Sequence, residues 1–456
     1  MMRPIQSPEL LEVYPGSAIT GPAEVTEVST DTRSLEPGFT YCALRGARFD
    51  GHLFNQAAYE AGANLLVVDH PDTLPLPQWI VPNTERALGY LGAFNRHLSS
   101  AQVVAITGSN GKTTTKEMLA TLLSRCGPTL ATQGNLNNAI GVPKTLLRIG
   151  PEHAFAVIEM GANHVGEIAY STRLTQPDIT VLLNAGRAHV GEFGSRARIR
   201  QAKGEIMQGL SAEGIAILND DDAGFAQWSA LAPGRVLSFG TKPSADIQVT
   251  TLQSDNQCSL VAVRSADFEH TVRLPMSGQH NVMNLAAAIA VMVALKLPDH
   301  LWLPAIAEIK PAAGRLVEHQ WHQWTLIDDT YNASPESVLA AIEVLAMKPQ
   351  PRILVLGELR ELGSETQSVL REIGQACRHR VDALWTIGSA ARYASGTFGR
   401  DGRHFDTQAE LLAALETELK SAEGGCILMK GSRAAALDAL LRDLMEALKL
   451  GASHSC

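Results

Sequence analysis

The chain has 456 residues, of which 45% are hydrophobic, and a formal net charge of −9. This length predicts about three domains, each large enough to bury a core. The acidic balance excludes a general affinity for nucleic acid, which requires a basic face, so phosphate groups have to be bound at specific local sites.

The six cysteines lie singly along the chain and form no CxxC pair. Neither a zinc site nor a disulfide framework is therefore expected, and reduced thiols in the cytosol are the simplest interpretation. The N-terminus lacks a charged segment followed by an apolar one, and no apolar run approaches the ~20 residues of a membrane span. We expect a cytoplasmic protein without membrane insertion, and we take it to be a monomer.

Residues 1–98 are predicted to form a small α/β domain. Strands are expected at 38–44 and 64–68, with a helix at 52–62 between them. A proline-rich stretch follows, and then a short strand and a helix that ends near residue 100.

Residues 99–312 are predicted to form a central domain with a mostly parallel sheet of the P-loop ATPase type. Buried-type strands alternate with helical stretches, which favours parallel strands joined by crossover helices. The strands are expected at 102–107, 155–159, 178–184 and 214–219. Residues 245–275 instead alternate apolar and polar side chains with period two, as antiparallel strands do.

Residues 313–456 are predicted to form a second α/β domain of Rossmann-like type. Its strands are expected at 324–327, 352–356, 383–387 and 426–429, with helical stretches between them. The whole chain is thus predicted to be α/β with three domains. Because the carboxyl ends of parallel strands gather at one edge of a sheet, functional side chains are expected there.

The strongest local signal is a glycine loop between the strand at 102–107 and a helix at 115–125. It reads Thr107-Gly108-Ser109-Asn110-Gly111-Lys112-Thr113-Thr114. Its backbone N–H groups and the helix N-terminus suit phosphate, Lys112 would reach the β- and γ-phosphates, and the Thr113 hydroxyl would bind Mg²⁺. The first glycine lies four residues before the lysine, not six as in the common spacing. The flanking strand and helix still favour ATP binding over a chance turn.

Three further side chains are predicted to join this loop in a catalytic site with Lys112. Glu159 ends a strand and would hold Mg²⁺ beside Thr113, His189 lies just past another strand, and Lys203 lies in a helical stretch. Each has a simpler interpretation by itself, as a capping acid, a loop histidine or a solvated lysine. Their order relative to the phosphate loop favours function.

In this order the motifs resemble the Mur ligase family, and the resemblance covers essentially the whole chain. It includes Asn184-Ala185-Gly186-Arg187-Ala188-His189, His280-Asn281-Val282-Met283-Asn284, Gly314-Arg315 and Lys430-Gly431-Ser432-Arg433. Two segments resemble the members that add D-alanyl-D-alanine, namely Asn135-Leu136-Asn137-Asn138 with Ile140-Gly141-Val142-Pro143, and Glu159-Met160-Gly161-Ala162-Asn163-His164.

The resemblance implies a ligase that uses ATP to convert the carboxylate of UDP-N-acetylmuramoyl-tripeptide into an acyl phosphate and then joins it to D-alanyl-D-alanine. It implies two Mg²⁺ ions, one held by Thr113 and Glu159 and one near His189. It also implies a carbamate on Lys203 that supports the second ion, which requires a neutral amine and therefore a lowered pKa.

The resemblance further implies which residues contact the nucleotide and the substrates. For the nucleotide these are Asn281, Asn284, Arg315, Asp329, Tyr331 and Asn332, in addition to the phosphate loop. For the UDP-linked substrate and the dipeptide they are Ser29, Asp31, Thr32, Arg33, Arg45, Asn135, Asn137, Asn138, Lys430, Ser432 and Arg433. Helix capping by Asn281 and a plain turn with a solvated ion pair at 29–33 are the alternatives. The residue before Pro335 is Ser334 in this chain, whereas members of the family usually have asparagine at that position.

Two other functions have to be weighed against this one. Another ligase of the superfamily, such as a folylpolyglutamate synthase or a different muropeptide ligase, would share the phosphate loop, Glu159, His189 and Lys203. The segment 135–138 together with a UDP-type first domain distinguishes the members that add D-alanyl-D-alanine from these other ligases. A switch-type nucleotide-binding protein would need no second metal site, and it would release no phosphate in response to an amine.

Overall fold

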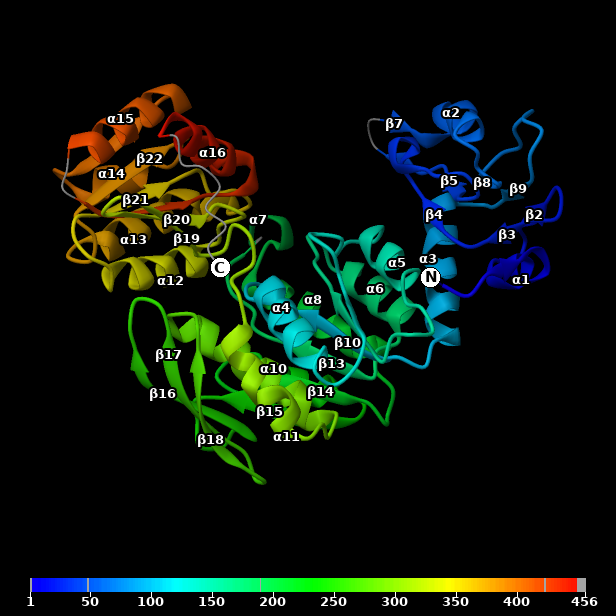
Figure 1. The fold of residues 1–456 in the computed structure, drawn as a ribbon, viewed down its shortest axis with the longest axis horizontal. Coiled ribbons are helices and arrows are strands. Elements are labelled where there is room, and N and C mark those ends of the chain that lie inside the picture. Colours follow the sequence, from blue (N-terminus) through cyan, green and yellow to red (C-terminus); the bar gives the residue numbers. More distant parts are fainter. Residues whose placement is uncertain (1, 47–48, 189, 422–423, 449–456) are drawn as a thin grey trace.

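The computed structural model describes residues 2–46, 49–188, 190–421 and 424–448, and three separate sheets divide them into three α/β units. The N-terminal and C-terminal units lie at opposite ends of the molecule, with the central unit between them (Figure 1). The predicted α/β class is confirmed. Within the described residues, no helix is both long and apolar enough to cross a membrane.

The N-terminal unit is built on a five-stranded sheet. Its order is β2 (Ala18–Ile19), β9 (Gln78–Ile80), β8 (Leu65–Val68), β5 (Thr40–Cys42) and β4 (Val28–Ser29), and two short ladders pair β1 (Ile5–Gln6) with β3 (Glu24–Val25) and β6 (Arg45–Gly46) with β7 (Phe49–Asp50). The helices are α1 (Ser7–Val13), α2 (Asn55–Glu60) and α3 (Thr84–Leu98), with short 3₁₀ helices at η1 (Thr32–Ser34) and η2 (Gly51–Phe54). The helix predicted at 52–62 is therefore a 3₁₀ turn followed by α2.

Helix α3 attaches this unit to the central one. Its start is capped by Asn83, whose Oδ1 accepts from the Arg86 backbone N–H at 2.8 Å. The helix packs against α5 (Gly141–Leu146) and α6 (Glu167–Thr175), and its buried Leu88 and Leu91 belong to the same apolar cluster as Leu147.

The central unit contains a nine-stranded sheet. Its order is β11 (Thr129–Ala131), β12 (Phe155–Glu159), β10 (Gln102–Thr107), β13 (Ile179–Leu182), β14 (Ile215–Asn219), β15 (Arg235–Gly240), β16 (Ile247–Ser254), β17 (Ser259–Arg264) and β18 (Glu269–Leu274). The strands are parallel as far as β16, and β16, β17 and β18 are antiparallel, as the change of period predicted.

Helices cover both faces of this sheet because successive strand residues point to opposite sides. Val104 and Ile106 belong to the cluster that includes the residues of α10 (Gln279–Ala294), whereas Val103 and Ala105 face the cluster of α6. The remaining helices are α4 (Lys112–Leu123), α7 (Val190–Phe193), α8 (Arg196–Gly204), η3 (Glu205–Gly209), α9 (Phe225–Leu231), α11 (Asp299–Trp302) and η4 (Leu303–Glu308).

The C-terminal unit has six strands. Their order is β19 (Val317–Trp321), β20 (Trp324–Asp329), β24 (Gly425–Lys430), β21 (Arg352–Leu356), β22 (Ala383–Ile387) and β23 (Gly402–Phe405). The sheet is parallel except for the edge strand β19, which the sequence did not indicate. Its helices are α12 (Pro335–Ala346), η5 (Gly363–Glu365), α13 (Thr366–Cys377), α14 (Arg392–Phe398), α15 (Gln408–Ser421), η6 (Arg433–Ala435) and α16 (Leu437–Ala447).

Candidate active site

The glycine loop lies between β10 and α4, at the carboxyl edge of the central sheet. Gly111 has a φ of 85°, and a Cβ at this position would lie 2.3 Å from Asn284 Oδ1, so the loop requires glycine here. Helix α4 begins at Lys112, three residues earlier than predicted. Its first backbone N–H groups have no acceptors within the helix, so they are available to phosphate oxygens.

A second loop, which follows β13, braces the phosphate loop. Asn110 donates its backbone N–H to Asn184 Oδ1 at 3.0 Å, and Asn184 returns its amide to Asn110 O at 3.1 Å. Ser109 donates its backbone N–H to Asn184 O at 3.0 Å and accepts from the Gly186 N–H at 3.0 Å. These four bonds hold the phosphate loop in one conformation, which is what a preorganised binding site needs.

Positive charge is concentrated beside this loop. Lys112 Nζ donates to Gly108 O at 2.8 Å. Burial lowers the pKa of Lys112, the Glu159 carboxylate opposes this, and the Arg315 charge lowers the pKa further. Arg315 donates to Thr113 Oγ1 at 3.1 Å, and its guanidinium lies 4.5 Å from the centroid of the Tyr331 ring. Two cations therefore lie at the phosphate loop.

Glu159 lies at the end of β12, opposite Ile106 of β10, and is buried. Its Oε1 accepts from the Asn137 amide at 2.7 Å, whereas its buried Oε2 has no hydrogen-bond partner among the described residues. A buried carboxylate oxygen without a partner is costly unless a cation binds it. Together with the Thr113 hydroxyl, Glu159 offers the oxygen ligands that Mg²⁺ prefers.

Lys203 lies on α8, with only 2% of its surface exposed. Burial and the nearby charge of Lys112 lower the pKa of Lys203 to about 7, although Glu167 and Glu205 oppose the shift. The lowered pKa favours the neutral amine, which is the form that reacts with CO₂. The predicted metal ligand His189 lies outside the described residues.

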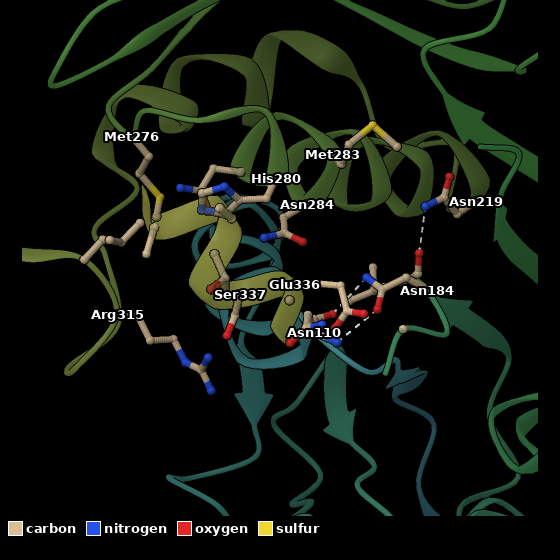
Figure 2. A pocket seen from close by; sticks show the side chains of 18 of the residues that line it. Asn110, Asn184, Asn219, Met276, His280, Met283, Asn284, Arg315, Glu336 and Ser337 are labelled. Atoms are coloured by element: carbon tan, nitrogen blue, oxygen red, sulfur yellow. Dashed lines mark hydrogen bonds between the residues drawn. The ribbon is translucent and has the colours of Figure 1, made fainter. Parts of the chain in front are cut away.

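A cavity of about 400 Å³ opens beside the phosphate loop, between α10 and the first turns of α12 (Figure 2). Met276, Met283 and Phe239 give it apolar walls, and Asn184 and Asn219 add amide groups. Apolar walls with a few polar groups are typical of a pocket for a flat aromatic base.

Helix α10 supplies one wall of this cavity. Asn284 and Asn281 both line it. Asn281 does not cap the helix, because Gly278 occupies the N-cap position and the Asn281 amide donates to Ser277 O at 2.8 Å. His280 also lines the cavity, and burial together with the Lys430 charge lowers its pKa to about 4, so this imidazole is neutral at physiological pH.

The C-terminal unit contributes a buried ion pair to the cavity. Asp329 at the end of β20 pairs with Lys430 at the end of β24, at 2.7 Å, and Lys430 also donates to Asn332 O at 3.0 Å. Burial raises the pKa of Asp329, and the Lys430 charge opposes this. Lys430 is thus held by a carboxylate and a carbonyl rather than projecting freely towards substrate.

A second cavity, of about 350 Å³, shares Asn110, Gly111, Arg315, Ser337 and Lys430 with the first. Its other predicted site residues are Ser109, Lys112, Asn135, Asn137, Asn138, Glu159, Tyr331 and Asn332. Within the segment 135–138, Asn137 orients Glu159. Asn138 accepts from the Gly141 N–H at 2.8 Å and thereby holds the start of α5, which is a structural role.

The predicted substrate residues of the N-terminal unit lie outside both cavities. Arg33 is exposed and pairs with Asp31 at 2.6 Å, which lowers the pKa of Asp31 to about 2. Ser29 donates to Asp31 O at 2.9 Å, Thr32 begins η1, and Arg45 pairs with two neighbouring aspartates.

Two predicted substrate residues after β24 are not among the described residues that line the two cavities. Ser432 is buried, and Arg433 is exposed and pairs with Asp438 at 3.0 Å. Burial raises the pKa of Tyr331, which lines the second cavity, and the Arg315 and Arg433 charges oppose this, so Arg433 nevertheless lies near that cavity.

Known proteins share this architecture from end to end. The chain matches the Mur ligase family catalytic domain over residues 24–108, the Mur ligase middle domain over 106–292 and the Mur ligase glutamate ligase domain over 314–433. A UDP-N-acetylmuramoyl-tripeptide–D-alanyl-D-alanine ligase of Escherichia coli is 39% identical over 96% of this chain and 98% of its own length. The chain belongs to the Mur ligase family. As the resemblance implied, this Mur ligase is an ATP-dependent amide ligase.

Solved structures agree with the assignment. A MurF from Acinetobacter baumannii superposes with a TM-score of 0.92 at 35% identity, over 98% of this chain and 99% of that chain. A MurF ligase from Thermotoga maritima in complex with ADP gives a TM-score of 0.84 at 27% identity, over 93% and 98% of the two chains.

Several lining residues of this Mur ligase were not predicted as site residues. Asn184 and His280 stood in recognised motifs without an assigned role, and Asn219 and Glu336 carried no signal of their own. Asn219 ends β14, so its position at the carboxyl edge of a parallel sheet was the one clue available.

Proposed function

We propose that this Mur ligase joins D-alanyl-D-alanine to UDP-N-acetylmuramoyl-tripeptide, using ATP and releasing ADP and phosphate, in the synthesis of peptidoglycan precursors. Support comes from the full-length similarity to a ligase of that name. The observation that carries the chemistry is that the second cavity joins the phosphate loop to the segment 135–138. We place the reaction in the cytoplasm, where ATP is available.

The residues around the cavities suit a reaction in two steps. In the first, a carboxylate oxygen of the tripeptide attacks the γ-phosphorus and the bond to ADP breaks, which gives an acyl phosphate. Lys112 and Arg315 would offset the charge of the two anions brought together. In the second, the dipeptide amine attacks the acyl carbon, the amine loses a proton, and phosphate leaves as the carbon–oxygen bond breaks.

The metal sites are part of the proposal. Thr113 and the unpartnered oxygen of Glu159 would hold one Mg²⁺. A second would be held by a carbamate on Lys203 and by His189, which lies outside the described residues. When bound, these ions would neutralise charge between the γ-phosphate and the acyl carboxylate. Asp329 would bind the ribose hydroxyls, and Asn284 would lie against the adenine.

Phosphate release from ATP with Mg²⁺ tests the proposal, measured with UDP-N-acetylmuramoyl-tripeptide in the presence and absence of D-alanyl-D-alanine. We expect release that depends on both substrates and a product whose mass is that of the pentapeptide. If protein that binds ATP released no phosphate with either a lysine or a diaminopimelate tripeptide, the proposal would be wrong. The other superfamily ligases would then be tested with their own amine acceptors.

A further inference from the structure

Among the described residues, Arg187 makes four hydrogen bonds from the central unit to the C-terminal unit, and the ligase chemistry proposed above gives it no role. It follows Gly186 in the loop after β13. Its backbone N–H donates to Glu336 Oε1 at 2.8 Å, and its Nε donates to the same oxygen at 3.2 Å. Its two terminal nitrogens donate to the two oxygens of Glu372 at 2.6 and 2.9 Å.

The geometry of these bonds is that of a fixed anchor rather than a chance surface pair. The Arg187 side chain is 12% exposed, and the planar guanidinium engages Glu372 through two parallel bonds. The partners lie on two different helices of the C-terminal unit, Glu336 in the first turn of α12 and Glu372 on α13. The pairing lowers the pKa of Glu372 and raises that of Arg187.

The same loop is bonded to the phosphate loop. Asn184 and Gly186 make the four hydrogen bonds to Ser109 and Asn110 described above. Helix α12 reaches the phosphate loop as well, because Ser334 at its N-cap donates to Asn110 Oδ1 at 2.7 Å. Arg187 therefore closes a ring of bonds that runs from the phosphate loop to the C-terminal unit and back.

A second contact lies nearby. Gly191 of α7 donates its backbone N–H to Glu361 O at 2.7 Å, and a Cβ on Gly191 would lie 2.7 Å from the Gly363 nitrogen. The two units thus approach each other backbone to backbone. The amide of Gly191 gives a local measure of whether they are docked, and it does not itself touch Arg187.

We propose that Arg187 is a positioning residue that docks the C-terminal unit, with Asp329, Tyr331 and Lys430, onto the phosphate loop. The nucleotide site needs residues from both units, so turnover depends on how well they are held together. The expected effect of Arg187 on turnover rests on the ligase function proposed above. Its role in holding the two units together rests on the described contacts alone.

Hydrogen exchange and kinetics of Arg187→Met test it, with Arg380→Met as the matched control. Arg380 pairs with Glu343 at 2.9 Å, and both residues belong to the C-terminal unit. We expect Arg187→Met to speed exchange of the Gly191 amide about 10-fold and to lower kcat/KM for ATP by up to about 10²-fold. The control should match the wild type in both.

Two further variants keep the test decisive. Glu372→Gln replaces Arg187→Met if that variant folds poorly, because Glu372 is half-exposed and its substitution disturbs the packing less. We expect Glu372→Gln to change exchange and kcat/KM in the same direction, but by smaller factors. Adding Glu372→Gln to Arg187→Met should speed exchange at Gly191 little beyond Arg187→Met alone, because the two residues act through one ion pair. Unchanged exchange at Gly191 in Arg187→Met, or fully additive effects in the double variant, would overturn the proposal. If the wild-type protein showed no dipeptide-dependent phosphate release, the proposed ligase function would be wrong. The docking role of Arg187 would not be affected by that result, because hydrogen exchange at Gly191 tests it separately.

Discussion

The central unit meets its two neighbours in different ways. Towards the C-terminal unit, Arg187, Arg315 and Ser334 make polar bonds across the boundary, and one cluster of buried apolar side chains contains both Ile158 and Ile342. Towards the N-terminal unit, α3 provides apolar packing. The contact nearest the predicted UDP-binding residues is a weak bond from Lys144 to Thr30 Oγ1 at 3.4 Å.

The difference separates a site that is already assembled from one that is not. The residues around the phosphate loop are buried and bonded to each other, whereas Asp31 and Arg33 pair with each other near solvent. A substrate that binds Arg33 has to replace that ion pair, while ATP would meet a site already formed. Substitutions at the first boundary should therefore affect the chemistry strongly, and those at the second should affect mainly substrate affinity.

The largest effect is expected from Lys112→Met. Removing the cation beside the phosphates should lower kcat for phosphate release by about 10³-fold, because charge stabilisation supplies most of the catalysis in phosphoryl transfer. Phosphate release measures this, and the exposed Lys420→Met is the matched control, expected to match the wild type. A loss smaller than about 10-fold would contradict the assignment of Lys112.

Lys203→Ala is expected to lower kcat by about 10²-fold, because the second metal would lose a ligand. In the wild type, ¹³C-bicarbonate should give a carbamate signal by nuclear magnetic resonance. The pKa of about 7 means that the neutral amine becomes more abundant between pH 6 and pH 8, so the signal should increase over this range. A wild-type spectrum without the signal at pH 8, or an equal signal in Lys203→Ala, would argue against the carbamate.

Asp329→Asn should act on both stability and nucleotide affinity. It leaves Lys430 buried without its carboxylate partner, which should lower the free energy of unfolding by about 3–5 kcal/mol. Chemical denaturation measures this, and the KM for ATP should increase as well. The double variant Asp329→Asn with Lys430→Met should lose less stability than Asp329→Asn alone. A loss in the double variant equal to the sum of the losses in Asp329→Asn and Lys430→Met alone would show that the pair is not coupled.

The smallest effect is expected from Arg33→Ala. The side chain is exposed, so the unfolding temperature should stay unchanged, while the KM for UDP-N-acetylmuramoyl-tripeptide should increase several-fold and that for ATP should not. Steady-state kinetics with each substrate varied in turn separates the two. Arg3→Ala, at another exposed pair of the same unit, serves as the control. An equal change in both KM values would mean that the two boundaries do not differ as proposed.

Much of the fold could be predicted from local pattern. The strands at 102–107, 155–159, 352–356 and 383–387 have the predicted bounds, because continuous apolar runs are strands buried on both faces of a parallel sheet. Strand β15 of the central sheet was missed, and so were the edge strands β11, β19 and β23, which are short or partly exposed and lack such a run. Helix α4 was placed three residues late because the polar residues Lys112 to Thr114 give no helical period, although they form its first turn.

The sequence by itself determined the α/β class and placed the glycine loop between a strand and a helix, and it predicted which groups would handle phosphate and metal, because residue type and order along a strand end carry that information. It did not determine which side chains face each other across the domain boundaries. Only the tertiary structure showed that Arg187 pairs with Glu372 and that Lys430 is held by Asp329. The reason is physical: these contacts join residues far apart in the chain, and their energies depend on burial and distance, which a linear pattern does not encode.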